Sequence, residues 1–162
     1  MRINQGVEWA IHACVNLVWI DGGPASSARL AEFHELPPAY LNKQLQALSR
    51  AGVLKSVPGQ HGGFALARAP EAISTLDVMQ AIEGDEPAFR CAEIRQRGPL
   101  PASKASCRTP CQINSIMLGA EAAWRAELDR HTIAEIAADV SATAPAVPER
   151  VRRWFLRGAD RS

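Results

Sequence analysis

Apolar residues recur at intervals of three and four along the first third of the chain, and this periodicity predicts a series of short helices. The first helix is expected over residues 4–20, where the apolar positions form a single face. A second helix is expected over residues 27–35, with Ser26 as its N-cap. A third helix begins near Pro38, and Gly52 suits its C-terminal end. Two short helices joined by a tight turn form a helix-turn-helix pattern.

A β-hairpin is predicted directly after the third helix. Residues 53–57 and 64–68 are expected to form its strands, because residues 58–63 between them are rich in turn formers. A further helix over residues 75–83 follows the hairpin. This order predicts a mainly α fold with a small β-hairpin, namely a winged helix-turn-helix DNA-binding domain over residues 1–84.

The second region, residues 85–140, combines an irregular segment with a long helix. Residues 85–109 are proline-rich and lack periodicity. The long helix is expected to start in the sequence Thr109-Pro110-Cys111-Gln112, with Thr109 as the cap, and to end near Arg130. A short helix should follow over residues 132–140. The long helix has an apolar stripe, made of Ile113, Ile116, Met117, Ala120, Trp124 and Leu128.

Acidic residues are distributed unevenly, although the net charge is only +1. No Asp or Glu lies between Glu35 and Glu71, a stretch that covers the predicted third helix and hairpin. Such a surface can face phosphates without repelling them, which favours a double-stranded DNA partner. The basic residues of this stretch are Lys43, Arg50, Lys55 and Arg68, together with His61.

Candidate DNA contacts follow from the usual docking of a helix-turn-helix. The second helix of the motif enters the major groove, the start of the first faces the backbone, and a wing can reach the minor groove. The alternative is a small helical domain that binds protein instead of DNA. The predicted contacts are Ser26 and Ser27 at the backbone, Pro38, Tyr40, Asn42, Lys43 and Gln44 in the major groove, and Gln60 and His61 on the wing.

Four cysteines occur, and their positions predict two different roles. Cys14 lies on the apolar face of the first helix and is expected to be a buried hydrophobic residue. Cys91, Cys107 and Cys111 lie in or beside the irregular segment, which suggests metal or redox chemistry. Cys111 falls in the first turn of the predicted long helix, where the helix dipole favours a thiolate and hence a metal ligand. Two ordinary loop thiols are the alternative at residues 107 and 111.

Glu8 and His12 lie four residues apart and therefore share one face of the first helix. A carboxylate and an imidazole at this spacing can chelate one metal ion. The alternative is a surface Glu–His pair with no ligand.

Several motifs together resemble the Rrf2 family of bacterial transcription regulators over about residues 1–140. These are VEWAIHACV, PPAYLNKQLQALSRAGVLKSV, GGFALAR and ISTLDVMQAIEG, followed by a cysteine loop before a long helix. The resemblance implies a homodimer with one winged helix-turn-helix in each subunit and a long dimerisation helix. It also implies an iron–sulfur cluster that controls the affinity for DNA.

The cysteine spacing departs from the three closely spaced cysteines of many cluster-binding relatives. Fifteen residues separate Cys91 from Cys107, and three separate Cys107 from Cys111. The segments GVEWAIH and CAEIRQRGPL, with the late paired cysteines, are similar to a redox-responsive member that holds a [2Fe–2S] cluster. That similarity implies a mixed ligand set, with Cys107 and Cys111 from one subunit and Glu8 and His12 from the other. Cys91 is then the less favoured ligand. A zinc site or a disulfide at Cys107 and Cys111 is the alternative.

Other features narrow the class of protein. No apolar run approaches the roughly 20 residues of a membrane span, and the first segment does not resemble a signal peptide, so a cytoplasmic protein is expected. No nucleophile–base pair, phosphate-binding loop or paired acids indicate an enzyme or a small-molecule substrate. Residues 141–162 are rich in Ala and Pro, which predicts a mobile C-terminal tail, although Trp154, Phe155 and Leu156 can dock on the core.

Overall fold

The structure is a computed structural model that describes residues 3–21 and 23–159. It divides the chain into two compact units. Arg2–Asp85 and Leu128–Ser162 form one unit, here called the winged-helix unit, and Glu86–Glu127 form the other, here called the cysteine-loop unit. Each unit is described by itself.

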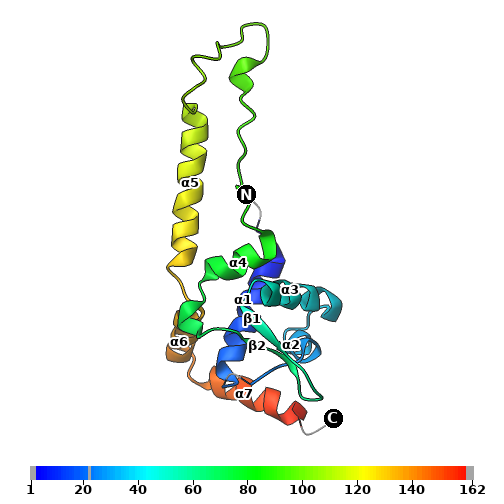
Figure 1. Ribbon diagram of the computed structural model, residues 1–162. Coiled ribbons are helices and arrows are strands. Elements are labelled where there is room, and N and C mark those ends of the chain that lie inside the picture. The colour runs from blue at the N-terminus through cyan, green and yellow to red at the C-terminus, as the bar shows by residue number, and fades with distance from the viewer. Residues whose placement is uncertain (1–2, 22, 160–162) are drawn as a thin grey trace. The chain divides into compact units, whose positions relative to one another are not determined.

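The winged-helix unit has the predicted order of two short helices followed by a hairpin (Figure 1). Several of its helices begin where a polar side chain caps them: Ser26, for example, accepts a hydrogen bond from the Arg29 amide at 3.2 Å. The fold is therefore the predicted mainly α winged helix with one two-stranded sheet. The elements are α1 (Gln5–Trp19), α2 (Ser27–Phe33), α3 (Pro38–Arg50), β1 (Leu54–Val57), β2 (Gly63–Leu66), η1 (Pro70–Ala72), α4 (Thr75–Glu83), α6 (Ile133–Thr143) and α7 (Ala146–Ala159).

The hairpin is fixed against the start of α2. Its strands are antiparallel, and Leu54 pairs with Leu66. Beyond the pair, Phe64 exchanges backbone hydrogen bonds with Ala25 at 2.8 and 3.0 Å. Gly63 makes this approach possible, because its φ is +151° and a Cβ atom there would lie 2.2 Å from the Ala25 carbonyl oxygen. The wing and the N-terminus of α2 are therefore held together by backbone contacts.

The core of the winged-helix unit surrounds α1, which packs against α3, α4, α6 and α7. The predicted apolar faces of α1 and α3 are buried in it. Cys14 is completely buried, as expected of a small hydrophobic side chain. The largest fully buried side chains are Leu17, Leu30, Leu41, Leu45, Leu48, Leu54, Ile73 and Ile133.

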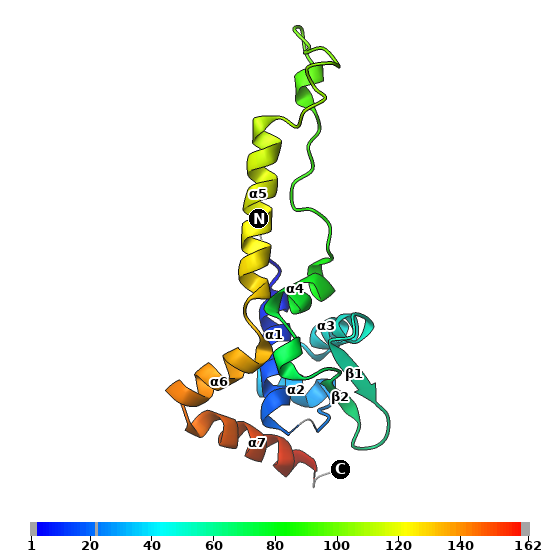
Figure 2. The ribbon, with the colours of Figure 1, turned by 60° about the vertical axis from the view of Figure 1, so that its left-hand side comes forward.

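The C-terminal segment is helical and docked, unlike the mobile tail that its composition predicts. Helix α7 packs against α1 and α6, and its aromatic residues reach α2. The ring of Phe33 lies 5.0 Å from that of Trp154 and 5.4 Å from that of Phe155, between centroids. Of the three residues expected to dock, Trp154 and Phe155 do so, whereas Leu156 is 61% exposed. In Figures 1 and 2 the C-terminal end of α7 and the loop of the hairpin lie on the same side of the unit.

The cysteine-loop unit contains η2 (Ile94–Gln96) and all but the last two residues of the long helix α5 (Gln112–Asp129). The helix begins later than predicted, because Cys111 rather than Thr109 occupies the position before its first residue. The Ser115 amide donates to the Cys111 carbonyl at 3.0 Å, which is the first helical bond. In the middle of α5, the buried Glu121 carboxylate accepts a hydrogen bond from the Ala88 amide at 3.0 Å.

Across the residues that the structure describes, no helix combines the length and the apolar character needed to cross a membrane.

Candidate nucleic-acid interface and metal ligands

Helix α3 presents most of its predicted DNA contacts to solvent. Pro38, Tyr40 and Lys43 are exposed and Asn42 is partly exposed. Gln44 is different: it is only 5% exposed, and its side chain lies over Gly6 of α1. The structure therefore corrects the prediction for Gln44, whose side chain belongs to the interface between α1 and α3.

Tyr40 connects the recognition helix to α1. Its hydroxyl donates to the Asn4 side-chain oxygen at 3.2 Å. Its ring meets the ring of Trp9 edge-on, with 5.2 Å between centroids. Because Trp9 lies on α1 between Glu8 and His12, the candidate metal ligands and the candidate DNA contacts are joined by one aromatic pair.

The remaining predicted DNA contacts surround one surface pocket of the winged-helix unit. Gln60 and His61 are exposed at the wing tip, whereas Ser26 and Ser27 are half-buried at the start of α2. The Ser26 hydroxyl caps α2, so its role at the candidate interface is to stabilise the N-terminus of this helix. The pocket has a volume of about 300 Å³, and Ser26, Gln60 and His61 all line it.

Glu8 and His12 are exposed on adjacent turns of α1 and line the same small pocket, together with Trp9, His34 and Leu36. The sequence analysis did not single out His34. Its ring centroid lies 5.6 Å from that of His12, and the Asn16 side-chain amide donates to its Nε2 atom at 2.7 Å. Burial, and then the nearby charge of His12, lower the pKa of His34. A second imidazole, held in a defined orientation, thus stands beside the predicted ligand pair.

An apolar pocket of about 300 Å³ adjoins the other side of this pair. Glu8 and His12 form its polar edge, and its remaining lining is mostly apolar. The apolar lining residues are Ile3, Val7, Ile11, Met79 and Leu128.

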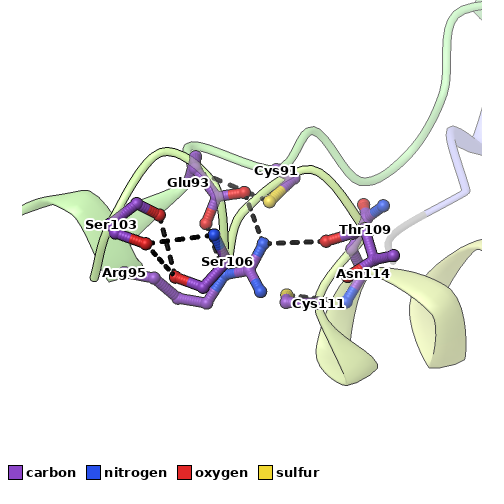
Figure 3. A network of polar contacts seen from close by, with 8 residues as sticks. All are labelled: Cys91, Glu93, Arg95, Ser103, Ser106, Thr109, Cys111 and Asn114. Atoms are coloured by element: carbon purple, nitrogen blue, oxygen red, sulfur yellow. Dashed lines mark hydrogen bonds and ion pairs between the residues drawn. The ribbon is translucent and has the colours of Figure 1, made fainter.

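Cys111 is positioned by the start of α5. Its Sγ atom accepts a hydrogen bond from the Asn114 amide at 3.3 Å, in the manner of an N-cap side chain (Figure 3). Cys107 and Cys111 are both partly exposed, and Cys91 is exposed.

Arg95 is the second residue that the sequence analysis missed. Its guanidinium donates to the Glu93 carboxylate at 2.6 and 2.8 Å and to the Thr109 carbonyl at 3.1 Å (Figure 3). Hydrogen bonding to Glu93, and also the proximity of Cys107 and Cys111, raise the pKa of Arg95. A permanent positive charge therefore stands beside the two predicted thiol ligands.

Cys91 shares a pocket with Cys111 rather than lying apart from it. The pocket has a volume of about 640 Å³ and is also lined by Arg95 and Ile113. The Cys91 Sγ atom accepts a hydrogen bond from the Glu93 amide at 3.4 Å. Both ends of the irregular segment thus contribute a thiol to one cavity.

Comparison with known proteins identifies the family. Residues 3–139 match the Rrf2 family, described as an iron-dependent transcriptional regulator. The chain belongs to the Rrf2 family. Rrf2 proteins are DNA-binding transcription regulators, and the winged helix-turn-helix described above is consistent with that function.

Individual Rrf2 relatives agree with this assignment. The regulator CymR of Bacillus subtilis is 34% identical over 60% of this chain and 78% of its own. An HTH-type transcriptional regulator of Synechocystis sp. is 36% identical, but the match covers 51% of this chain and only 57% of that relative.

Solved structures share the fold. IscR of T. potens superposes with a TM-score of 0.64 at 23% identity, covering 89% of this chain and 91% of its own. The oxidized form of Staphylococcus aureus CymR superposes with a TM-score of 0.62 at 25% identity, covering 85% of this chain and 96% of its own.

The candidate donor residues of this Rrf2 protein are of types that bind iron, but they lie in two different units of the chain. Within residues 3–21 and 23–159, no three His, Cys, Asp or Glu side chains come together in a way that could hold a metal ion. The winged-helix unit offers Glu8 and His12, and the cysteine-loop unit offers Cys107 and Cys111. Thiolate, imidazole and carboxylate are all ligands that iron accepts. Each unit thus contains one of the two predicted ligand pairs.

Proposed function

We propose that this Rrf2 protein is a homodimeric redox sensor whose affinity for its operator depends on a [2Fe–2S] cluster shared between two subunits. The division of the donors into two pairs carries the proposal. Glu8 and His12 of one subunit, with Cys107 and Cys111 of its partner, complete a set of four ligands. When bound, the cluster supplies a one-electron change between two oxidation states.

The residues around each pair are suited to hold it in place. Asn16 orients His34, whose imidazole borders the same pocket as Glu8 and His12. Neighbours that orient ligands in this way influence the properties of metal sites strongly. On the other unit, the Arg95 guanidinium lies near Cys107 and Cys111, and the Asn114 amide donates to the Cys111 Sγ atom.

The contact between α1 and α3 supports a route from the ligands to DNA. Trp9 follows Glu8 directly and contacts Tyr40 of the recognition helix. A small change in the position of α1 would therefore alter the tilt of α3. Because a dimer must place two recognition helices about one DNA turn apart, a small shift in each lowers affinity. In this proposal DNA is contacted by Ser26, Ser27, Pro38, Tyr40, Asn42, Lys43, Gln60 and His61.

Helix α5 supports the homodimer. Its predicted apolar stripe is largely exposed in the single chain, where Ile113 is 65% and Ile116 60% exposed. Glu121 is the one buried side chain recorded for α5 within the described part of the chain. An apolar face of this kind is typical of a helix that packs against a second copy. On this basis residues 1–84 serve as the DNA-binding domain and residues 85–140 as the cysteine loop and dimerisation helix.

Complementation between two defective variants tests the shared site. Glu8→Ala/His12→Ala protein and Cys107→Ala/Cys111→Ala protein are purified without oxygen, and each is expected to lack the visible absorption of a cluster. Co-expressed with different affinity tags, the mixed dimers should recover one of the two sites, with iron and sulfide in equal amounts. If the ligands came from a single chain, mixed dimers would stay colourless, which contradicts the shared site.

The alternative is an Rrf2 regulator that responds through thiols alone or through zinc. The observation that favours it is the cavity shared by Cys91 and Cys111, together with the likeness to a CymR structure in its oxidized form. A wild-type protein that is colourless after reconstitution, and that forms a disulfide or binds Zn²⁺ through Cys107, Cys111 and His12, would establish this alternative instead.

A further inference from the structure

Helix α7 lies outside the part of the chain that matches the Rrf2 family, which ends at residue 139. It is nevertheless packed into the winged-helix unit through Val151, Trp154 and Phe155. The polar contacts of Arg152 also hold it, since this guanidinium donates to the Trp19 carbonyl at 3.2 Å and to Asp21 at 2.9 Å. Because these contacts hold α7 in place, its exposed residues form a fixed part of the surface of the winged-helix unit.

The solvent face of α7 is strongly basic. Between residues 146 and 159 the helix has one acidic residue, Glu149, and four arginines. Glu149 forms ion pairs with Arg152 and Arg153. Arg157 is exposed in the last turns, and no partner is recorded for it among the described residues. Such a face fits a polyanion.

The C-terminal end of α7 lies beside the proposed DNA contacts. Phe155 and Leu156 line the same 300 Å³ pocket as Ser26 of α2 and Gln60 and His61 of the wing. The wing loop and the end of α7 also point to the same side of the unit in both ribbon views. Arg157 follows Leu156 directly, so its backbone lies within one helical turn of this pocket, and its side chain is exposed.

A second arginine is held in place by α7. The Arg29 guanidinium, in the first turn of α2, lies 3.7 Å from the centroid of the Trp154 ring and donates to the Trp154 carbonyl at 2.8 Å. Helix α7 therefore orients a cation at the α2 terminus, where a winged helix meets the DNA backbone.

We propose that α7 is a DNA-contacting element in which Arg157 binds a phosphate flanking the half-site, next to the wing. The inference rests on DNA binding by the winged helix but not on the cluster. Each phosphate contact adds about 0.9 to the slope of log K against log salt. Phosphate contacts carry no base preference, so the contribution is the same for operator and non-operator duplexes.

The test compares Arg157→Gln with the matched variant Arg150→Gln. Arg150 lies seven residues earlier on the same exposed face, about 10 Å further from the wing along the helix axis. Fluorescence anisotropy with a labelled random-sequence duplex, between about 50 and 200 mM salt, gives the slope for each protein. Arg157→Gln should lower the slope by about 0.9 per bound subunit, and Arg150→Gln should leave it unchanged.

Three results would overturn the proposal. The first is an unchanged slope for Arg157→Gln, and the second is an equal loss for both variants, which indicates only a long-range charge effect. The third is a wild-type protein that binds no duplex at low salt, which refutes the DNA role itself. A colourless protein that still binds DNA rejects the cluster and leaves this test intact. Equal melting temperatures for both variants show that the fold is preserved.

Discussion

Cys14 differs chemically from the three cysteines of the cysteine-loop unit. Complete burial raises the pKa of the Cys14 thiol to about 12, from 9.0. In the unfolded chain the same thiol ionises near its ordinary pKa. Its contribution to stability is therefore complete below pH 9 and is lost as the pH rises from 9 towards 12.

The first expectation is an alkaline loss of stability that depends on Cys14. Between pH 9 and pH 10.5, the free energy of unfolding should fall by about 1.4 kcal/mol per pH unit because of this thiol. Chemical denaturation of wild-type and Cys14→Ala proteins, each at several pH values, isolates the contribution of the Cys14 thiol to the free energy of unfolding. Identical pH dependence in the two proteins would show that the Cys14 thiol is not buried as described.

Residue roles were predictable from the sequence only where the helical period was followed strictly. The burial of Cys14 was evident because it shares a face with other apolar residues. Gln44 lies three residues after Leu41 and one before Leu45, so the same period places it on the buried face of α3. Its amide group had suggested a DNA contact instead. Arg95 and His34 gave no such signal, because their roles depend on contacts across the fold.

Among the elements, the hairpin depends on one glycine. Gly63→Ala should weaken the backbone contact with Ala25, because the added Cβ atom would overlap the carbonyl group. Gly59→Ala, on the wing loop, is the matched control: its φ is also positive, at +111°, but nothing lies within 4 Å of its Cβ position. We expect Gly63→Ala to lower the free energy of unfolding by about 3 kcal/mol and Gly59→Ala by about 1 kcal/mol. Denaturant titration measures both, and equal losses would mean that contact with Ala25 does not matter.

Most elements of the winged-helix unit could be predicted from their N-caps and their apolar periods. The start of α5 and the conformation of residues 141–162 could not. Thr109 and Pro110 form a good helix start, yet α5 begins after them because Cys111 itself caps the helix. In the tail, the Ala- and Pro-rich composition suggested mobility. Pro148 falls in the first turn of α7, where proline is tolerated, and the docking of Trp154 compensates for low local propensity.

At the scale of the whole molecule, the exposed stripe of α5 predicts assembly. Ile116→Glu places a charge in the proposed dimer interface and should convert the dimer into monomers, with a loss of operator affinity. Ala122→Glu places the same charge on the opposite face of α5 and should leave the dimer intact. Light scattering of the two variants distinguishes them. A dimeric Ile116→Glu protein would contradict an interface along this stripe.

The sequence predicted this stripe from its spacing alone, and the resemblance to the family implied its use. The proposed ligand set did not follow from residue spacing, because Glu8 and His12 lie in one unit and Cys107 and Cys111 in the other.

The proposed sharing of ligands between two subunits also has a consequence in the cell. If each site takes two of its four ligands from each chain, a newly synthesised monomer cannot respond to redox signals until it forms a dimer. Sensing then depends on protein abundance as well as on oxidants. A chain that lacks one pair of ligands would inactivate one of the two sites in every dimer that it joins. A minority of such chains would therefore weaken the response of the intact chains.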